Sequence, residues 1–132
     1  MPLLLDATVW VASVVPENRF HRDAVSVVRL ERHLAALDLT LLDVANALGV
    51  KLAQPLRARR LCDLIVARCP RRLVRIGPDL VEAALEIAAE HHLTAYDAAY
   101  VATARSENLT LVSADLKDLV SKGLAVAPDA AV

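Results

Sequence analysis

The segment Leu93–Asp115, LTAYDAAYVATARSENLTLVSAD, combines the patterns of a helix, a buried strand and a terminal acid. Thr94 and Asp97 match the Ser/Thr-x-x-Asp/Glu pattern that caps helix N-termini, so we predict a helix that runs to about Asn108. The apolar residues that follow predict a strand over 109–113. An acid therefore comes directly after a predicted buried strand.

The N-terminus repeats this arrangement in the order strand, acid, helix. Residues 2–5 form a short apolar run that ends in Asp6, and residues 7–15 continue apolar without glycine, which predicts a strand that turns into a helix. In open α/β sheets the functional crevice lies beyond the carboxyl ends of the strands. We therefore expect Asp6 and the turn between Ser113 and Asp115 to meet at one edge of a parallel sheet.

Helical and strand patterns alternate along most of the remaining chain, which predicts the α/β fold class, with a parallel sheet covered by helices. In chain order, these patterns predict a helix over 19–37, a strand over 37–39, a helix capped by Thr40 that ends near Gln54, a helix to Cys69, a basic edge strand over 71–76, helices over 79–92 and 115–122, a last strand over 124–127 and a frayed tail.

Length and composition indicate one folded unit, residues 1–132. Hydrophobic residues make up 56% of the chain and charged residues 23%, which is unlike a disordered segment. No apolar run approaches the roughly 20 residues that span a bilayer, and Asp6 interrupts any signal peptide, so we expect a cytoplasmic protein. Cys62 and Cys69 lie about two helical turns apart, too far for a disulfide, and are expected to be reduced.

Basic residues are concentrated in one part of the chain although the net charge is only -1. Residues 51–75 contain eight Lys and Arg against the single acid Asp63. Such a cluster can bind RNA phosphates without reading sequence, and it can equally be a solvated face. The candidate RNA-binding residues are Arg57, Arg59, Arg60, Arg71 and Arg72.

Four acids are candidates for one site: Asp6, Asp97, Asp115 and, one turn into the helix expected after Thr40, Asp43. Taken singly, each is also explained as a cap, a turn former or a solvated residue. Clustered carboxylates repel one another, and proteins keep them together chiefly when a divalent cation neutralises them. Oxygen ligands without a His or Cys cluster favour Mg²⁺ or Mn²⁺, which points to phosphodiester chemistry.

The same acids lie in four segments that resemble the acidic motifs of PIN domains, especially those of VapC toxins. The segments are LLLDATVWVA, LLDVANAL, LTAYDAAYVATA and LTLVSAD, which begin at Leu3, Leu41, Leu93 and Leu109, and the resemblance covers nearly the whole chain. It implies a PIN-like three-layer α/β/α fold with a short central parallel sheet of four to five strands. It also implies a metal-dependent endoribonuclease that hydrolyses RNA phosphodiester bonds.

The resemblance assigns roles residue by residue. Asp6, Asp43, Asp97 and Asp115 correspond to the catalytic acids, and Asp6, Asp97 and Asp115 among them to ligands of Mg²⁺ or Mn²⁺. The supporting residues it implies are the hydroxyls of Thr8 and Ser113 and the acid Asp118. One position departs from the family, which normally has Glu where this chain has Asp43, a side chain shorter by one methylene.

Partners follow from the same resemblance. It implies an RNA substrate, a VapB-like antitoxin and a homodimer, with no membrane association. The apolar residues Trp10, Val11, Val14 and Val15 are expected to be part of the antitoxin surface. Two alternatives remain: a catalytically weakened PIN-fold module that binds RNA or antitoxin, and an aspartyl phosphotransferase. The second would need another acid where Thr8 stands.

Overall fold

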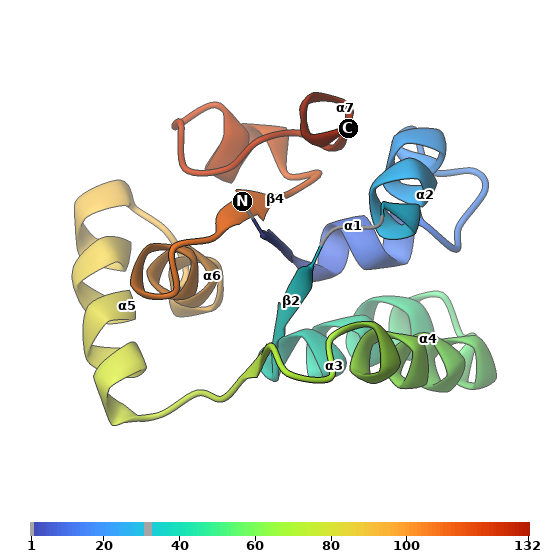
Figure 1. The fold of residues 1–132 in the computed structure, drawn as a ribbon, viewed down its shortest axis with the longest axis horizontal. Helices are drawn as coiled ribbons and strands as arrows, with labels where there is room; N and C mark the ends of the chain where they lie inside the picture. The colour runs from blue at the N-terminus through green and yellow to red at the C-terminus, as the bar shows by residue number, and fades with distance from the viewer. Residues whose placement is uncertain (1, 31–32) are drawn as a thin grey trace.

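The sheet at the centre of the molecule has four parallel strands in the order β3-β2-β1-β4. In chain order these strands are β1 (Leu3–Leu5), β2 (Leu34–Leu37), β3 (Leu73–Val74) and β4 (Thr110–Val112). The computed structural model describes residues 2–30 and 33–132. Figure 1 shows the helices on both sides of this sheet, which confirms the predicted three-layer α/β/α architecture and the number of strands.

Successive residues of each strand pack into different cores, one on each face of the sheet. Leu3 and Leu5 pack in the first core and Leu4 packs in the second. In β4, Val112 packs in the first core and Leu111 in the second. This is the period of two that a strand imposes on its side chains. Both faces are covered, so the strands are apolar at successive positions rather than at alternate ones, with Thr110 at the start of β4 as the exception.

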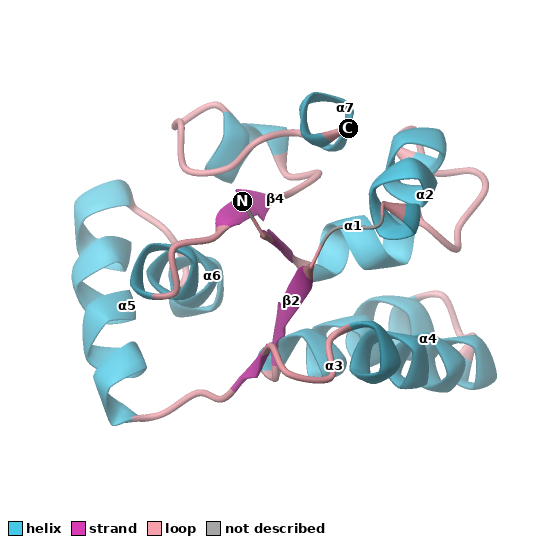
Figure 2. Ribbon diagram, in the orientation of Figure 1, coloured by secondary structure: helices cyan, strands magenta, loops and turns pink. Residues whose placement is uncertain are grey.

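The first face carries the N-terminal half of the chain and the last helix (Figure 2). Trp10, from the helix that directly follows β1, is fully buried in this core. The elements of this face are α1 (Ala7–Ala12), α2 (His21–Arg29), α3 (Leu39–Val44), the π-helix η1 (Ala45–Lys51), α4 (Pro55–Arg68) and α7 (Pro128–Ala131).

The second face is covered mainly by α5 (Pro78–His91) and α6 (Ala95–Ser106), with the short π-helix η2 (Leu116–Val120). The chain leaves α5 through His92, which has a left-handed backbone with φ 56°. Two residues later Thr94 caps α6, because its hydroxyl accepts a hydrogen bond from the amide of Asp97. The predicted capping pattern at this helix is confirmed, and the cap fixes Asp97 in the first turn.

The region around β2 differs from the prediction. The helix predicted over residues 19–37 ends at Arg29, and the strand begins at Leu34 rather than Leu37, while residues 31–32 of that prediction lie outside the described residues. All four residues of β2 are apolar and buried, so the sequence shows no alternation of polar and apolar residues that would identify a strand. The apolar residues of β2 also continue the helical spacing of the residues before them. The helix predicted to start at Thr40 begins at Leu39, and the Thr40 side chain is buried inside it.

The C-terminal prediction was also partly wrong. Residues 124–127 do not form the predicted strand. Within this segment only Val126 pairs with the sheet, through one isolated parallel bridge to Val112. The tail expected to fray instead forms α7, whose Pro128 and Ala131 are buried.

The prediction that Trp10 belongs to a partner surface was wrong, because its side chain is fully buried in the core. In the described residues no helix combines the length and apolarity needed to cross a membrane.

Candidate active site

The carboxyl ends of β1 and β4 bring the first and last predicted acids to one edge of the sheet. Asp6 follows β1 directly, and its backbone amide donates to the carbonyl of Val112 at the end of β4, with N···O 3.2 Å. Asp115 comes three residues after Val112. A cavity of about 750 Å³ opens at this edge, and its walls include Asp6, Asp43, Asp97 and Asp115.

Asp6 is the buried acid of this cavity, with 4% of its surface exposed. It is the N-cap of α1: its Oδ1 accepts hydrogen bonds from the amides of Thr8 (3.0 Å) and Val9 (3.4 Å), and also from the Thr8 hydroxyl. These donors explain why a carboxyl tolerates this position, since the first amides of a helix need acceptors.

Burial is nevertheless the larger influence on Asp6. It raises the pKa of this carboxyl from 3.8 to about 6, and hydrogen bonds from Ser113, Thr8 and the backbone only partly oppose that rise. Among the described residues, no Lys, Arg or His forms an ion pair with Asp6. The cavity therefore holds a buried carboxyl whose negative charge has hydrogen-bond donors but no cationic partner.

Three further acids gather where α6 and η2 begin. Carboxylate oxygens of Asp97, Asp115 and Asp118 lie within 4.8 Å of one another. Asp115 caps η2 by accepting from the amide of Asp118 (2.9 Å), and Ser113 Oγ in turn accepts from the amide of Asp115 (3.0 Å). Burial first, and then the charges of Asp115, Asp118 and Asp43, raise the pKa of the Asp97 carboxyl.

Thr8 and Ser113 connect the two groups of acids. Thr8 Oγ1 accepts from the amide of Ala114 (2.9 Å) while its hydroxyl donates to Asp6, and it lies 3.4 Å from Ser113 Oγ. These contacts tie the start of α1 to the turn after β4. The two hydroxyls therefore fix the Asp6 carboxylate relative to the backbone of residues 114 and 115.

Asp43 is held differently, by a residue that the sequence analysis did not assign. The Tyr100 hydroxyl donates to Asp43 Oδ2 (2.9 Å) and lies 3.0 Å from the Thr40 hydroxyl. Tyr100 is 2% exposed, and it follows Asp97 by three residues, which places both on one face of α6. The spacing of three residues between Asp97 and Tyr100 was the sequence signal that could have identified Tyr100 as a site residue, although an aromatic residue at helical spacing is usually only a packing residue.

Tyr100→Phe is expected to lower roughly tenfold the RNA cleavage that the resemblance to PIN domains implies, because the lost hydrogen bond orients a charged carboxylate and such bonds are worth about 1.5–3 kcal/mol. The ring and its packing stay in place, so the fold should be unchanged by circular dichroism. In an Asp43→Asn background the same change should add little, which a double-mutant cycle measures. Equal losses in both backgrounds would show that Tyr100 acts independently of Asp43.

Two basic residues that line the acidic cavity were also not predicted as site residues. Arg19 and Lys51 line it together with the aromatic rings of Phe20 and Tyr96. The Arg19 guanidinium lies over the Phe20 ring, 4.8 Å from its centroid. Arg19, Phe20 and Lys51 come from other elements than Asp6, Asp97 and Asp115, and only Tyr96 is a sequence neighbour of one of these acids, so the fold assembles this rim.

None of the five arginines predicted to bind RNA lines the acidic cavity. Arg57 donates to the carbonyl of Val14 (3.2 Å), and Arg59 lies 3.8 Å from Asp63 on the exposed side of α4. Arg71 and Arg72 line a separate cavity beside β2 and β3. The structure therefore brings the predicted acids together but spreads the predicted bases over other surfaces.

The donor set of the acidic cavity suits a hard divalent cation. Its acids are Asp6, Asp43, Asp97 and Asp115. Oxygens of Asp97 and Asp115 and of the neighbouring Asp118 are close enough to share one ion, and Asp97 has a pKa raised in part by its acidic neighbours. A cation would remove that repulsion. Carboxylate oxygens without imidazole or thiolate are the ligands that Mg²⁺ and similar ions prefer.

Fold and site together define a class: a small parallel α/β protein with a carboxylate cluster at the carboxyl edge of its sheet. The PIN domain model matches residues 3–119, so the chain belongs to the PIN domain family. No curated protein is similar enough in sequence to count as a match.

Solved structures show the same fold. A toxin-antitoxin complex from Klebsiella pneumoniae has a TM-score of 0.70 at 21% identity, over 96% of this chain and 97% of that one. The protein PAE2754 from Pyrobaculum aerophilum has a TM-score of 0.71 at 25% identity, over 98% and 85%. VapC20 from Mycobacterium tuberculosis, described as a sarcin-ricin loop cleaving toxin, has a TM-score of 0.76 at 17% identity, over 92% and 95%.

Proposed function

We propose that this protein is a VapC-like endoribonuclease that hydrolyses RNA phosphodiester bonds at its carboxylate cavity with Mg²⁺ or Mn²⁺. The observation that carries the proposal is the convergence of Asp97, Asp115 and Asp118 oxygens within 4.8 Å, at a cavity that Asp97 and Asp115 line together with Asp6 and Asp43. Membership of the PIN domain family and the fold shared with a ribonuclease toxin support it.

Each acid has a distinct task in this proposal. Asp6, Asp97 and Asp115 would hold the cation, Asp43 would complete the catalytic set, and Asp118 would supply further negative charge beside them. The bound cation would lower the pKa of a water and offset charge on the scissile phosphate. Thr8 would orient the Asp6 carboxylate, and Ser113 would position Asp115 through its backbone amide.

The basic and aromatic residues of the rim would supply affinity for RNA, a polyanion that the acids by themselves repel. Arg19 and Lys51 are placed to bind RNA phosphates next to the scissile bond, and the 65% exposed ring of Tyr96 offers a surface on which a base can stack. Phosphate contacts of this kind set the position of the strand rather than its sequence.

A VapB-like antitoxin and a second copy of the chain are the proposed protein partners. Structural neighbours include a toxin-antitoxin complex, and Leu42, Val50 and Leu56 on α3, η1 and α4 are each more than 70% exposed, as expected of a surface that a partner covers. A second apolar patch, containing Val81 and Leu85 of α5, supports a homodimer. RNA and antitoxin as partners imply a cytoplasmic protein.

One observation favours a second candidate, a PIN-fold module that binds RNA or antitoxin without cutting. Asp43 stands where the family has the longer Glu, and its Oδ2 accepts from Tyr100 instead of being free for a cation. In this reading, the shorter and engaged carboxylate has weakened catalysis while the rim and the apolar surfaces still bind.

Purified protein is expected to cleave single-stranded RNA in Mg²⁺ or Mn²⁺ and to stop when EDTA removes the ion, because in the proposed mechanism the bound cation lowers the pKa of the attacking water. Gel analysis of labelled RNA measures the products. Activity should return when the metal is restored. Binding of RNA without cleavage in either metal would select the second candidate, and cleavage that persists in EDTA would contradict both the metal site and the mechanism.

A further inference from the structure

A second large cavity, of about 1040 Å³, lies at the end of the sheet opposite the acids. Its lining includes the residues that come just before three of the parallel strands: His33 before β2, Arg71 and Arg72 before β3, and Leu109 before β4. The acids Asp6 and Asp115, by contrast, follow their strands. Since parallel strands share one direction, the two sets of residues are at opposite ends of the sheet.

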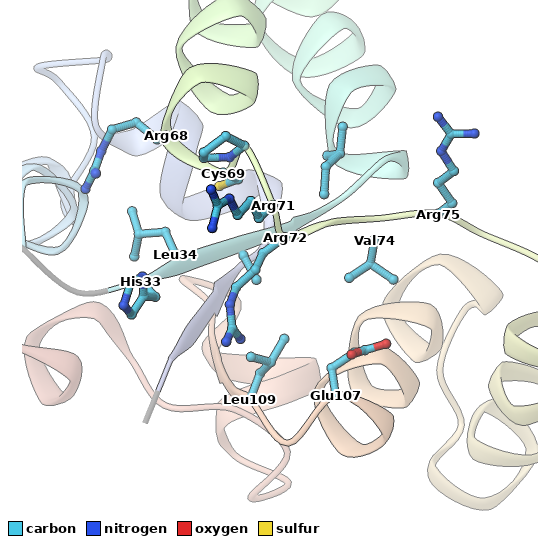
Figure 3. Close-up of a pocket in the computed structure, with 13 residues that line it drawn as sticks. His33, Leu34, Arg68, Cys69, Arg71, Arg72, Val74, Arg75, Glu107 and Leu109 are labelled. Atoms are coloured by element: carbon cyan, nitrogen blue, oxygen red, sulfur yellow. The ribbon is translucent and has the colours of Figure 1, made fainter.

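This cavity is basic. Arg68, Arg71, Arg72 and Arg75 line it against one acid, Glu107, among the described residues. Figure 3 shows Arg72 extending across the cavity toward Leu109, with Arg71 beside Cys69 and Arg75 directed away at its margin. The lining thus presents at least two guanidinium groups, next to the exposed imidazole of His33, to whatever enters.

The guanidinium groups differ in what they already bind. Arg68 donates to the carbonyls of Val28 (2.6 Å) and Leu30 (3.1 Å), so it satisfies the C-terminal end of α2 and has a structural task. Within residues 2–30 and 33–132, neither the Arg71 nor the Arg72 side chain makes a hydrogen bond or ion pair; only the backbone of Arg72 is hydrogen-bonded, and both residues are exposed. Their donors are available to a ligand.

We propose that this cavity binds phosphates of the RNA substrate that lie outside the cleaved bond, through Arg71 and Arg72. The inference rests on the proposed function, which makes RNA the ligand. Guanidinium groups match phosphate oxygens with paired donors. Leu34, Cys69 and Leu109 of the lining are buried, whereas three of its four arginines are exposed, so charge is the property that the cavity offers most strongly to a ligand.

A structural explanation competes with this one. β3 is a two-residue strand at the edge of the sheet, and charged residues on edge strands prevent pairing with other chains. In that case Arg71 and Arg72 would affect aggregation and not RNA. The two explanations therefore differ in a measurable way, namely in whether RNA affinity depends on the length of the RNA and on these two side chains.

The test measures binding by fluorescence anisotropy in the Asp97→Asn variant, so that RNA is not cut. The probes are a labelled hexanucleotide, chosen to occupy the acidic cavity without reaching the basic one, and a labelled RNA of about thirty nucleotides. Arg71→Gln/Arg72→Gln should weaken binding of the long RNA roughly tenfold and lower its salt slope by roughly 1.4, the value for two lost phosphate contacts. Binding of the hexanucleotide should not change.

Arg22→Gln/Arg105→Gln is the matched control, because both arginines are exposed and line neither cavity. It should leave the long RNA bound as tightly as before. An equal loss in the control, an equal loss with the hexanucleotide, or no loss at all would overturn the proposal. So would an acidic peptide that requires Arg71 and Arg72 for binding while the long RNA does not. Failure of the proposed function is separate, since it appears as absent cleavage by the wild-type protein.

Discussion

Asp97→Asn is expected to reduce RNA cleavage by roughly a thousandfold or more, which is the scale seen when a metal-site or catalytic group is removed. Asp97 belongs to the acidic cluster with Asp115 and Asp118, and the charge of Asp43 also contributes to the raised pKa of its carboxyl. Replacement by an amide of the same shape removes one negative charge from this group. The measurement is single-turnover cleavage of labelled RNA at saturating metal.

The fold should survive this substitution, because the cap of α6 uses the backbone amide of Asp97 and the Thr94 hydroxyl, not the carboxylate. Calorimetric titration with Mn²⁺ should show weakened or lost binding, which gives a readout independent of activity. Asp79→Asn is the matched control: Asp79 is an exposed acid in the first turn of α5, outside the acidic cavity. Cleavage that remains at the wild-type rate in Asp97→Asn would dismiss this site.

Asp6→Asn is expected to stabilise the metal-free protein at neutral pH by up to about 3 kcal/mol. In the folded protein burial raises the pKa of Asp6 to about 6, against 3.8 in its unperturbed state. A carboxyl with a raised folded pKa supports the fold fully below about pH 4, and this support is lost as pH rises through 6. The amide has no charge to bury, and its oxygen can still accept from the amides of Thr8 and Val9.

Urea unfolding in EDTA at several pH values between 4 and 7 measures this effect. The wild type should lose stability relative to Asp6→Asn across that interval, and the two should converge near pH 4. Asp63→Asn is the control, because the side chain of Asp63 is 74% exposed and carries no comparable burial. A constant difference between wild type and Asp6→Asn over the whole interval would contradict a titrating Asp6. The same variant should be inactive, so stability and function would change in opposite directions.

Local patterns predicted the elements that hold most of the site. The apolar run that ends in Asp6 became β1, and the capping pair Thr94 and Asp97 became the first turn of α6. Both depend on interactions within a few residues, which a sequence displays directly. The start of β2 was predicted wrongly, because a strand buried on both faces has no alternation to separate it from the helix before it.

Sequence alone therefore determined the α/β class, the order of most elements and which acids follow strands, since these properties follow from hydrophobic period and capping over short distances. Tertiary structure decided the rest: that Tyr100 holds Asp43, that Arg19 and Lys51 border the acids, and that Arg71 and Arg72 lie at the opposite end of the sheet. It also decided the pKa of Asp6. These properties depend on burial and on contacts between distant residues, which exist only after the strands have paired in one register.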